Sequence, residues 1–200
     1  GIAPLAANAK PAPAKKSHKP RVLIVSDSVF AMLNVADNAL AELNAKVPVI
    51  FGGQGCQKLL TSGCMPGVKL SAMAHFRAER GKFTDAILVA TGYNENRADA
   101  LEVALAAFRQ EAKKQHVRLI WATYRIAGNV VEKATNFNRQ LRAAAKKDPT
   151  LALFDWNKIS ANKPSWFSGD KVHLSRGGAV QLARQLSKFL KSTLDSPANR

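Results

Sequence analysis

The sequence predicts an α/β fold with three layers, in which helices cover both faces of a five-stranded parallel sheet. Five short apolar runs are nearly continuous rather than alternating, as expected of strands buried on both faces of such a sheet. Patterns with the period of an α-helix lie between them, so strand and helix alternate along the chain. The apolar runs span residues 22–25, 47–51, 86–90, 117–122 and 151–156.

The helices are predicted from apolar side chains that recur every three or four residues along one face. The four clearest faces comprise Val35, Ala39, Leu40 and Leu43; Leu101, Ala104, Leu105, Phe108 and Ala112; Val130, Ala134, Phe137 and Leu141; and Leu182, Leu186, Phe189 or Leu190, and Leu194. We expect the pair Asn96 and Asp99 to cap the second of these helices. Asn129 is expected to cap the third, and Pro149 follows its end. Residues 68–80 are expected to be helical with a weaker pattern.

The chain has 200 residues, enough for one domain that buries most of its apolar surface. We expect this domain to span residues 21–195 and to be followed by a short tail, 196–200. Residues 1–20 are rich in Ala, Pro and Lys, which predicts a flexible linker. No apolar stretch approaches the roughly 20 residues that span a bilayer. Since neither an initiator methionine nor a signal peptide is present, we expect a processed or trimmed chain.

The net charge of +16 is the unusual feature of the composition. A charge of this size attracts polyanions such as nucleic acid, anionic lipid or acidic cell-wall polymers. It also serves solubility alone, and this alternative stays open. The sequence lacks basic strands interleaved with aromatic residues, which stack on bases, so no specific nucleic-acid partner is expected.

The two cysteines, Cys56 and Cys64, lie eight residues apart in a stretch that reads as a loop. A disulfide between them would suit an oxidising compartment, and we favour it over two free thiols. Neither histidine nor further cysteine lies nearby, so no metal site is expected there.

Ser28 follows the first predicted strand and precedes a helix. Ligands bind at the carboxyl edge of open parallel sheets, so the residues after each strand are the candidates for chemistry. A serine at this turn lies near the positive end of a helix dipole, which suits a nucleophile. An Asp-Ser pair before a helix also serves as an N-cap, and Ser28 alone does not decide between these roles.

The second and third predicted strands are followed by groups that can donate hydrogen bonds. The glycines of residues 52–56 either let the backbone approach a ligand or form a tight turn. The side-chain N–H of Asn94 can point at a developing oxyanion. Its alternative role is to cap the next helix, which suits Asn96 better.

Asp170 and His173 lie on an irregular segment between the last predicted strand and the last helix. At this spacing the carboxylate can accept a hydrogen bond from imidazole Nδ1 and leave Nε2 as the base for a serine. The other histidines suit this role less. His18 lies in the linker, His75 in a predicted helix and His116 at the amino end of a strand. The alternative for His173 is an ordinary surface histidine.

Together these segments resemble those of the SGNH, or GDSL-type, hydrolases and acyltransferases. That family has a Gly-Asp-Ser turn, a Gly after the second strand, a Gly-x-Asn after the third and an Asp-x-x-His before the last helix. The matching segments are Ser26-Asp27-Ser28, Gly55, Gly92-Tyr93-Asn94 and Asp170-Lys171-Val172-His173, and the resemblance spans residues 21–195.

The chain departs from the family pattern at two positions. Ser26 stands where Gly is usual, which a turn tolerates if its φ is negative, and Glu95 stands where many members have Asp. Gly53 is an alternative to Gly55 for the second block. The likeness is greatest to small secreted bacterial members and to the SGNH domains of cell-envelope O-acyltransferases.

The resemblance implies a flavodoxin-like three-layer fold and a catalytic triad. In this mechanism His173, oriented by Asp170, removes the proton of Ser28, which attacks an ester carbonyl. The oxyanion is then held by the backbone N–H groups of Ser28 and Gly55 and by the Asn94 amide. An acyl-enzyme forms and passes its acyl group to water or to a sugar hydroxyl. No cofactor or metal is implied.

The implied substrate is an ester-bearing carbohydrate of the cell envelope or a small acyl ester, with acetyl as the expected group. Trp166 and Phe167 either line the acyl or sugar pocket or pack in the core. We expect an extracytoplasmic location, with anionic cell-wall polymer and a membrane tether as further partners. Esterase and O-acyltransferase remain alternatives. A basic module that binds anionic polymer, and an SGNH-type domain that binds glycan without turnover, are non-catalytic alternatives.

Overall fold

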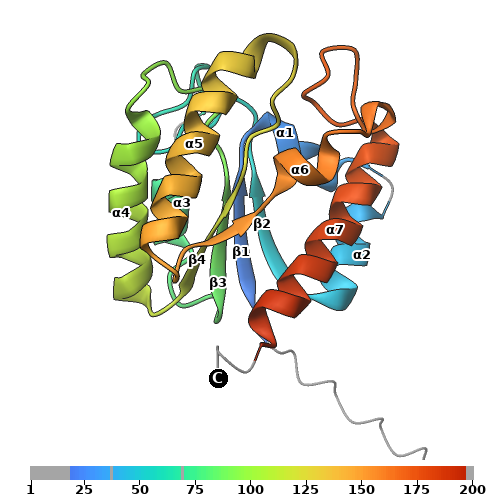
Figure 1. The fold of residues 1–200 in the computed structure, drawn as a ribbon. Helices are drawn as coiled ribbons and strands as arrows, with labels where there is room; N and C mark the ends of the chain where they lie inside the picture. Colours follow the sequence, from blue (N-terminus) through green and yellow to red (C-terminus); the bar gives the residue numbers. More distant parts are fainter. Residues whose placement is uncertain (1–18, 37, 69, 197–200) are drawn as a thin grey trace, which may run out of the picture.

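A computed structural model describes residues 19–36, 38–68 and 70–196 and confirms the predicted α/β architecture (Figure 1). Five parallel strands form one sheet in the order β2-β1-β3-β4-β5. The strands are β1 (Val22–Ser26), β2 (Val49–Gly53), β3 (Ala86–Ala90), β4 (Arg118–Ala122) and β5 (Ala152–Phe154). Because all five run the same way, the segments that follow them meet at one edge of the sheet.

Helices cover both faces of the sheet. The α-helices are α1 (Ser28–Ala31), α2 (Ala39–Lys46), α3 (Ala72–Ala78), α4 (Ala100–Gln115), α5 (Val131–Lys147), α6 (Trp156–Ser160) and α7 (Arg176–Leu194). Short 3-10 turns are η1 (Met32–Asn34), η2 (Gly128–Val130) and η3 (Pro164–Trp166). Helices α3, α4 and α5 lie on one face, and α2 and α7 lie on the other (Figure 1).

Each strand divides its side chains between two hydrophobic cores. In β1, Val22 and Ile24 join the core beneath α2 and α7, and Leu23 and Val25 join the core beneath α3, α4 and α5. All four side chains are fully buried. This two-sided burial explains why the strands read as continuous apolar runs.

The predicted strand ends are wrong in two places. The second strand lies at Val49–Gly53, two residues later than its apolar run. The last strand ends at Phe154, because Asp155 accepts a hydrogen bond from the Lys158 amide and starts helix α6 at Trp156. The aromatic residue at 156 therefore belongs to a helix that packs on the core.

Three of the predicted helix starts are also wrong. Val35 lies before α2 and is 60% exposed, so it is not part of that helix's buried face. Asp99 is the N-cap of α4 by position, but its carboxylate pairs with Arg97, and Asn96 does not cap the helix. Asn129 lies within η2, and α5 begins after it at Val131.

The helix predicted over 68–80 is shorter than expected. Helix α3 starts at Ala72, since the Ser71 hydroxyl accepts a hydrogen bond from the Ala74 amide at 3.0 Å. In the last helix, Leu190 is fully buried and Phe189 is half-buried, which decides between the two alternatives. Helix α5 ends two residues before Pro149, as predicted.

The two ends of the predicted domain meet at the amino edge of the sheet. Arg21 Nε lies 2.6 Å from Asp85 Oδ2, and Arg21 Nη1 lies 3.0 Å from Asp195 Oδ1. Residues 1–18 of the expected linker and 197–200 of the expected tail lie outside the described residues. None of the helices between residues 19 and 196 has the length and apolar character needed to cross a membrane.

Candidate active site

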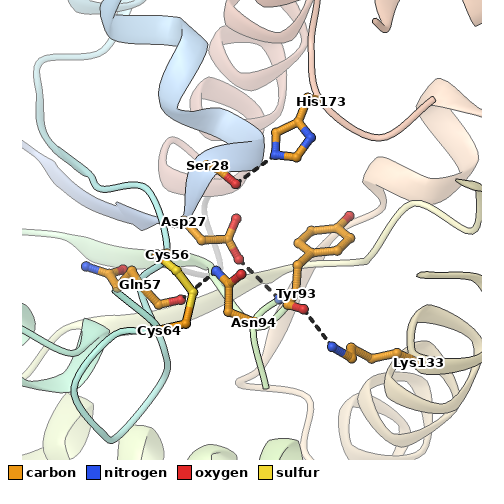
Figure 2. The surroundings of a disulfide bond; sticks show 9 residues. All are labelled: Asp27, Ser28, Cys56, Gln57, Cys64, Tyr93, Asn94, Lys133 and His173. Atoms are coloured by element: carbon orange, nitrogen blue, oxygen red, sulfur yellow. Dashed lines mark hydrogen bonds between the residues drawn. A yellow bond between two sulfur atoms is a disulfide. The ribbon is translucent and has the colours of Figure 1, made fainter. Parts of the chain in front are cut away.

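Ser28, His173 and Asp170 form a continuous chain of hydrogen bonds at the carboxyl edge of the sheet. Ser28 is the first residue of α1, directly after β1 and Asp27. Its Oγ lies 2.8 Å from His173 Nε2, as Figure 2 shows. On the other side of the ring, His173 Nδ1 lies 2.5 Å from Asp170 Oδ2. This order of atoms permits the imidazole to accept the serine proton while the carboxylate fixes the tautomer.

The Asp170 carboxylate is held by its own loop. Its Oδ1 accepts hydrogen bonds from the backbone N–H groups of Val172 and His173, both at 2.9 Å, and from the Ser168 hydroxyl at 3.0 Å. Partial burial opposes ionisation, but these hydrogen bonds and the His173 contact outweigh it and hold the pKa of Asp170 well below its ordinary value. The carboxylate therefore stays ionised wherever the imidazole is neutral.

Asp27 joins the serine turn to the segment after β3. Its side chain is fully buried. One oxygen accepts from the Val29 N–H, and the other accepts from the N–H groups of Gly92 and Tyr93, all at 3.1 Å. Burial raises its pKa to about 6, although the three N–H donors act in the opposite direction. This carboxylate fixes the distance between the predicted nucleophile and the Asn94 segment.

Gly92, in the same segment, has no space for a side chain because Tyr124 packs against its backbone. Its φ is 146°, and a Cβ at this position would lie 2.4 Å from the Tyr124 hydroxyl oxygen. That hydroxyl donates to the Thr91 carbonyl at 2.8 Å. Ser26 stands where the SGNH pattern usually has Gly. It tolerates this position because its φ is negative, since it is not among the described residues with positive φ. The Ser26 hydroxyl also accepts from the Phe30 amide at 3.3 Å.

One of the three predicted oxyanion donors lies on the Ser28 turn, and the other two lie on the segments that follow β2 and β3 at the same edge of the sheet. The N–H of Ser28 begins α1, and neither it nor the N–H of Gly55 donates a hydrogen bond to another described residue. The space beside Gly55 is open, since a Cβ there would meet nothing within 4 Å. Asn94 Nδ2 donates one hydrogen to the Gln57 carbonyl at 3.0 Å, which leaves its second N–H free to donate.

The predicted disulfide between Cys56 and Cys64 is confirmed. Cys56 lies between Gly55 and Gln57 and adopts a left-handed conformation with φ 62°. The Cys64 N–H donates to the Cys56 carbonyl at 3.0 Å. Figure 2 shows the disulfide beside Asn94, on the side of the site away from His173. The cross-link thus braces the loop that presents Gly55 and orients Asn94.

The site is open to solvent. The His173 and Asp170 side chains are each 47% exposed. Phe167 is buried, packs on Trp156 and has Arg125 over its ring, so it belongs to the core. Trp166 is half-buried and stacks on Trp156, so part of its ring remains available to a substrate.

No protein-family profile matches this sequence. Two curated proteins of Staphylococcus aureus, from strains MSSA476 and MW2, are each 41% identical to the chain over 56 residues. Both are named "Putative O-acetyltransferase". The match covers 28% of this chain and only 9% of each relative, so the chain spans a small part of their length.

Solved structures match nearly the whole described domain. The C-terminal catalytic domain of Streptococcus pneumoniae peptidoglycan O-acetyltransferase A matches with a TM-score of 0.66, 19% identity, and 90% and 97% of the two chains covered. A lipase/acylhydrolase of Enterococcus faecalis matches with a TM-score of 0.62, 14% identity, and 86% and 96% covered. The chain has the fold of the SGNH hydrolases. A G-D-S-L lipolytic protein of Veillonella parvula shares this fold, with a TM-score of 0.64, 13% identity, and 84% and 96% covered.

The SGNH fold accounts for the edge at which the predicted residues meet, but two further residues were not predicted. Gln57 orients Asn94 through its backbone carbonyl, and its side-chain oxygen accepts from the Thr91 hydroxyl at 2.9 Å. Arg125 packs behind the Asp170 loop. A backbone carbonyl carries no signal in the sequence, and a single arginine after a strand resembles any surface cation.

Proposed function

We propose that the chain is a serine esterase or O-acyltransferase that uses Ser28, His173 and Asp170 as a catalytic triad. The observation that carries this proposal is the hydrogen-bond chain from Ser28 Oγ through the imidazole to the Asp170 carboxylate. The relatives that share the fold include enzymes named as acylhydrolase and O-acetyltransferase, which supports acyl-ester chemistry.

The reaction begins when Ser28 Oγ attacks the ester carbonyl carbon and its proton passes to His173 Nε2. The ionised Asp170 stabilises the imidazolium that results. Negative charge develops on the carbonyl oxygen, which the N–H groups of Ser28 and Gly55 and the second Asn94 N–H bind. The imidazolium then donates its proton to the leaving alcohol, and an acyl-enzyme remains.

In the second half of the reaction, His173 takes a proton from water or from a sugar hydroxyl. The resulting oxygen nucleophile attacks the acyl-enzyme, and the proton returns to Ser28 Oγ as the ester bond to the serine breaks. Esterase and acyltransferase differ only in which acceptor reaches this position.

We infer that the substrate is an acetyl ester of a cell-envelope carbohydrate and that the protein acts outside the cytoplasm. The open site admits a polymer, and half-exposed Trp166 offers a ring face of the kind that sugars stack on. The disulfide suits an oxidising compartment. The S. pneumoniae structure is described as a peptidoglycan O-acetyltransferase domain, which supports the same inference.

The test is mass spectrometry after treatment with a fluorophosphonate that reacts with activated serines. We expect one adduct on Ser28, absent from the Ser28→Ala variant and formed much more slowly by His173→Ala. No adduct, or labelling of another serine, overturns the proposal and favours a non-catalytic module that binds glycan or anionic polymer.

The direction of the reaction is decided by following an isotope-labelled acetyl ester with and without an oligosaccharide acceptor. Label in the sugar product identifies a transferase. Label recovered only as acetate, at the same rate with or without acceptor, identifies an esterase.

A further inference from the structure

Arg125 is a buried cation that forms no ion pair with the described acidic residues. The residue is 7% exposed, and within residues 19–36, 38–68 and 70–196 no carboxylate forms an ion pair with it. Burial lowers the pKa of its guanidinium below the ordinary value. Removing a charge from water costs several kcal/mol unless other hydrogen bonds replace the lost ones. The contacts that hold Arg125 therefore need to be specific.

The guanidinium donates to the backbone of two separate segments. Its Nε lies 2.7 Å from the carbonyl oxygen of Lys171. Its Nη1 lies 2.5 Å from the Ser160 carbonyl oxygen and 3.2 Å from the Ser160 hydroxyl. The guanidinium carbon also lies 3.8 Å from the centroid of the Phe167 ring, a cation–π contact. One side chain thus ties the loop after β4 to the end of α6 and to the segment between Asp170 and His173.

Lys171 follows Asp170 in the turn that leads to His173, and its N–H donates to the Ser168 carbonyl at 2.9 Å. Its φ is 67°, a left-handed conformation that costs a residue with a Cβ about 1 kcal/mol or more. The hydrogen bond from Arg125 to its carbonyl is a contact from outside the loop that favours this conformation. Gly128 supports the same loop, since a Cβ there would lie 2.3 Å from the Asp170 carbonyl oxygen.

Arg125 also contacts the segment that carries Asn94. Its backbone N–H donates to the Tyr93 hydroxyl oxygen at 2.7 Å. The residue is therefore connected both to the Asp170 loop and to the residue before Asn94. An apolar side chain of similar length would fill the same space without the desolvation cost. What the guanidinium adds is the fixed direction of its N–H groups.

We propose that Arg125 is a positioning residue that holds the Lys171 turn and thereby keeps Asp170 and His173 in register with Ser28. Its hydrogen bonds and ring contact among the described residues are with Tyr93, Lys171, Ser160 and Phe167, and none is with Ser28. The proposal rests on the function proposed above and assigns to this cation a role in the same site.

The central experiment compares Arg125→Met with the wild type in the hydrolysis of an activated acetyl ester. A displacement of the imidazole by about 1 Å reduces the rate by about 10- to 100-fold, so kcat should fall by that factor with little change in KM. Glu111→Gln is the matched control, because Glu111 is a buried charge that pairs with Arg77 and Arg80. It should lower the melting temperature and leave kcat unchanged where both variants are folded.

Two further measurements distinguish positioning from a general loss of stability. Free guanidinium ion at concentrations that do not denature should raise kcat of Arg125→Ala and leave kcat of Glu111→Gln unchanged. In proton NMR, the His173 Nδ1–H signal of the Asp170-paired ring should broaden in Arg125→Met. If that variant does not fold, Arg125→Lys is the substitute, because it keeps the positive charge but lacks the planar set of guanidinium N–H donors. Its kcat should also fall, with little change in KM.

The outcomes separate this proposal from the proposed function. If the wild type turns over ester but the Arg125 variants retain its kcat, or lose it only in proportion to their melting temperature, the positioning role is wrong and the triad stands. If the wild type neither forms the Ser28 adduct nor hydrolyses ester, both proposals fail together.

Discussion

Asn94 is the predicted oxyanion donor whose orientation depends most on its neighbours. One of its two side-chain hydrogens is used by the Gln57 carbonyl, and the other is available for the oxyanion. The fixed hydrogen bond limits rotation of the amide, so the second N–H points in a set direction before substrate binds. Such preorganisation is what makes oxyanion donors effective.

We predict that Asn94→Ala lowers kcat by about 100- to 1,000-fold, because one donor to the oxyanion is lost. The measurement is steady-state hydrolysis of an activated acetyl ester. Asn96→Ala is the matched control, since Asn96 is an exposed amide two residues further along and should leave kcat unchanged. Equal kcat values for the two variants would contradict the assignment of Asn94.

The loop closed by Cys56 and Cys64 lies next to Gly55, a predicted oxyanion donor, and contains Gln57, which orients a second one, Asn94. Gly55 precedes Cys56 in the chain, and Gln57 follows it. Loss of the cross-link releases a loop of about nine residues, which corresponds to about 2–3 kcal/mol of stability in the chain-entropy account. Since the rest of the domain has its own cores, we expect the loop to loosen before the domain unfolds.

Reduction of the disulfide with a dithiol should therefore lower the rate of Ser28 acylation while the far-ultraviolet circular dichroism stays unchanged. Re-oxidation should restore the rate. The Cys56→Ser, Cys64→Ser double variant should behave as the reduced protein does and should no longer respond to the dithiol. An acylation rate that is the same in oxidised and reduced protein would show that the loop needs no cross-link.

The order and type of the main elements could be predicted from the sequence, because burial on both faces produces continuous apolar runs. The starts of α2, α4 and α5 could not be predicted in the same way. Asp99 is a favourable cap residue, but its carboxylate is used by Arg97 in space. Asn129 was expected to cap α5 and instead lies in a 3-10 turn. Local propensity does not reveal which of several competing partners a polar side chain finds.

The residues of the candidate site that belong to sequence motifs could be predicted, and the contacts that support them could not. Ser28 follows β1, and Asp170 and His173 lie on the segment after β5. These segments meet because the carboxyl ends of parallel strands lie at the same edge of the sheet. The supporting contacts join residues far apart in the chain, such as Asp27 with Gly92, and Arg125 with Lys171. These contacts depend on backbone geometry that only the folded chain reveals.

Two buried carboxylates should give the whole molecule opposing responses to pH. Burial raises the pKa of Asp27 to about 6, above its ordinary value of 3.8. The folded state then binds this proton more tightly than the unfolded state, so stability falls as pH rises from about 4 to about 6. In Glu111, burial acts the same way, but hydrogen bonds from Gln115, Arg80 and Arg77 outweigh it and lower the pKa to about 2. The ionised Glu111 carboxylate therefore stabilises the folded state fully above about pH 4.5, and this stabilisation is lost as pH falls to about 2.

We predict that the free energy of unfolding, measured with urea from pH 2 to 7, changes by about 3 kcal/mol through each of these groups. Asp27→Asn should remove the decline between pH 4 and 6. Glu111→Gln should reduce the rise between pH 2 and 4.5 by about 3 kcal/mol, leaving the part that comes from the lowered pKa of Asp170, and should leave the decline in place. Variants with the same profile as the wild type would contradict the assignments.

The exposure of the triad has a consequence for competition between acceptors. Because His173 and Asp170 are half exposed among the described residues, the proposed acyl-enzyme would be in contact with bulk water, and we expect its hydrolysis whenever no sugar acceptor is bound. A sugar hydroxyl prevails only if it is bound in line with the acyl carbon, where its effective concentration exceeds that of the solvent. We therefore expect affinity for the acceptor, rather than exclusion of water, to determine what fraction of the acyl groups the proposed enzyme transfers.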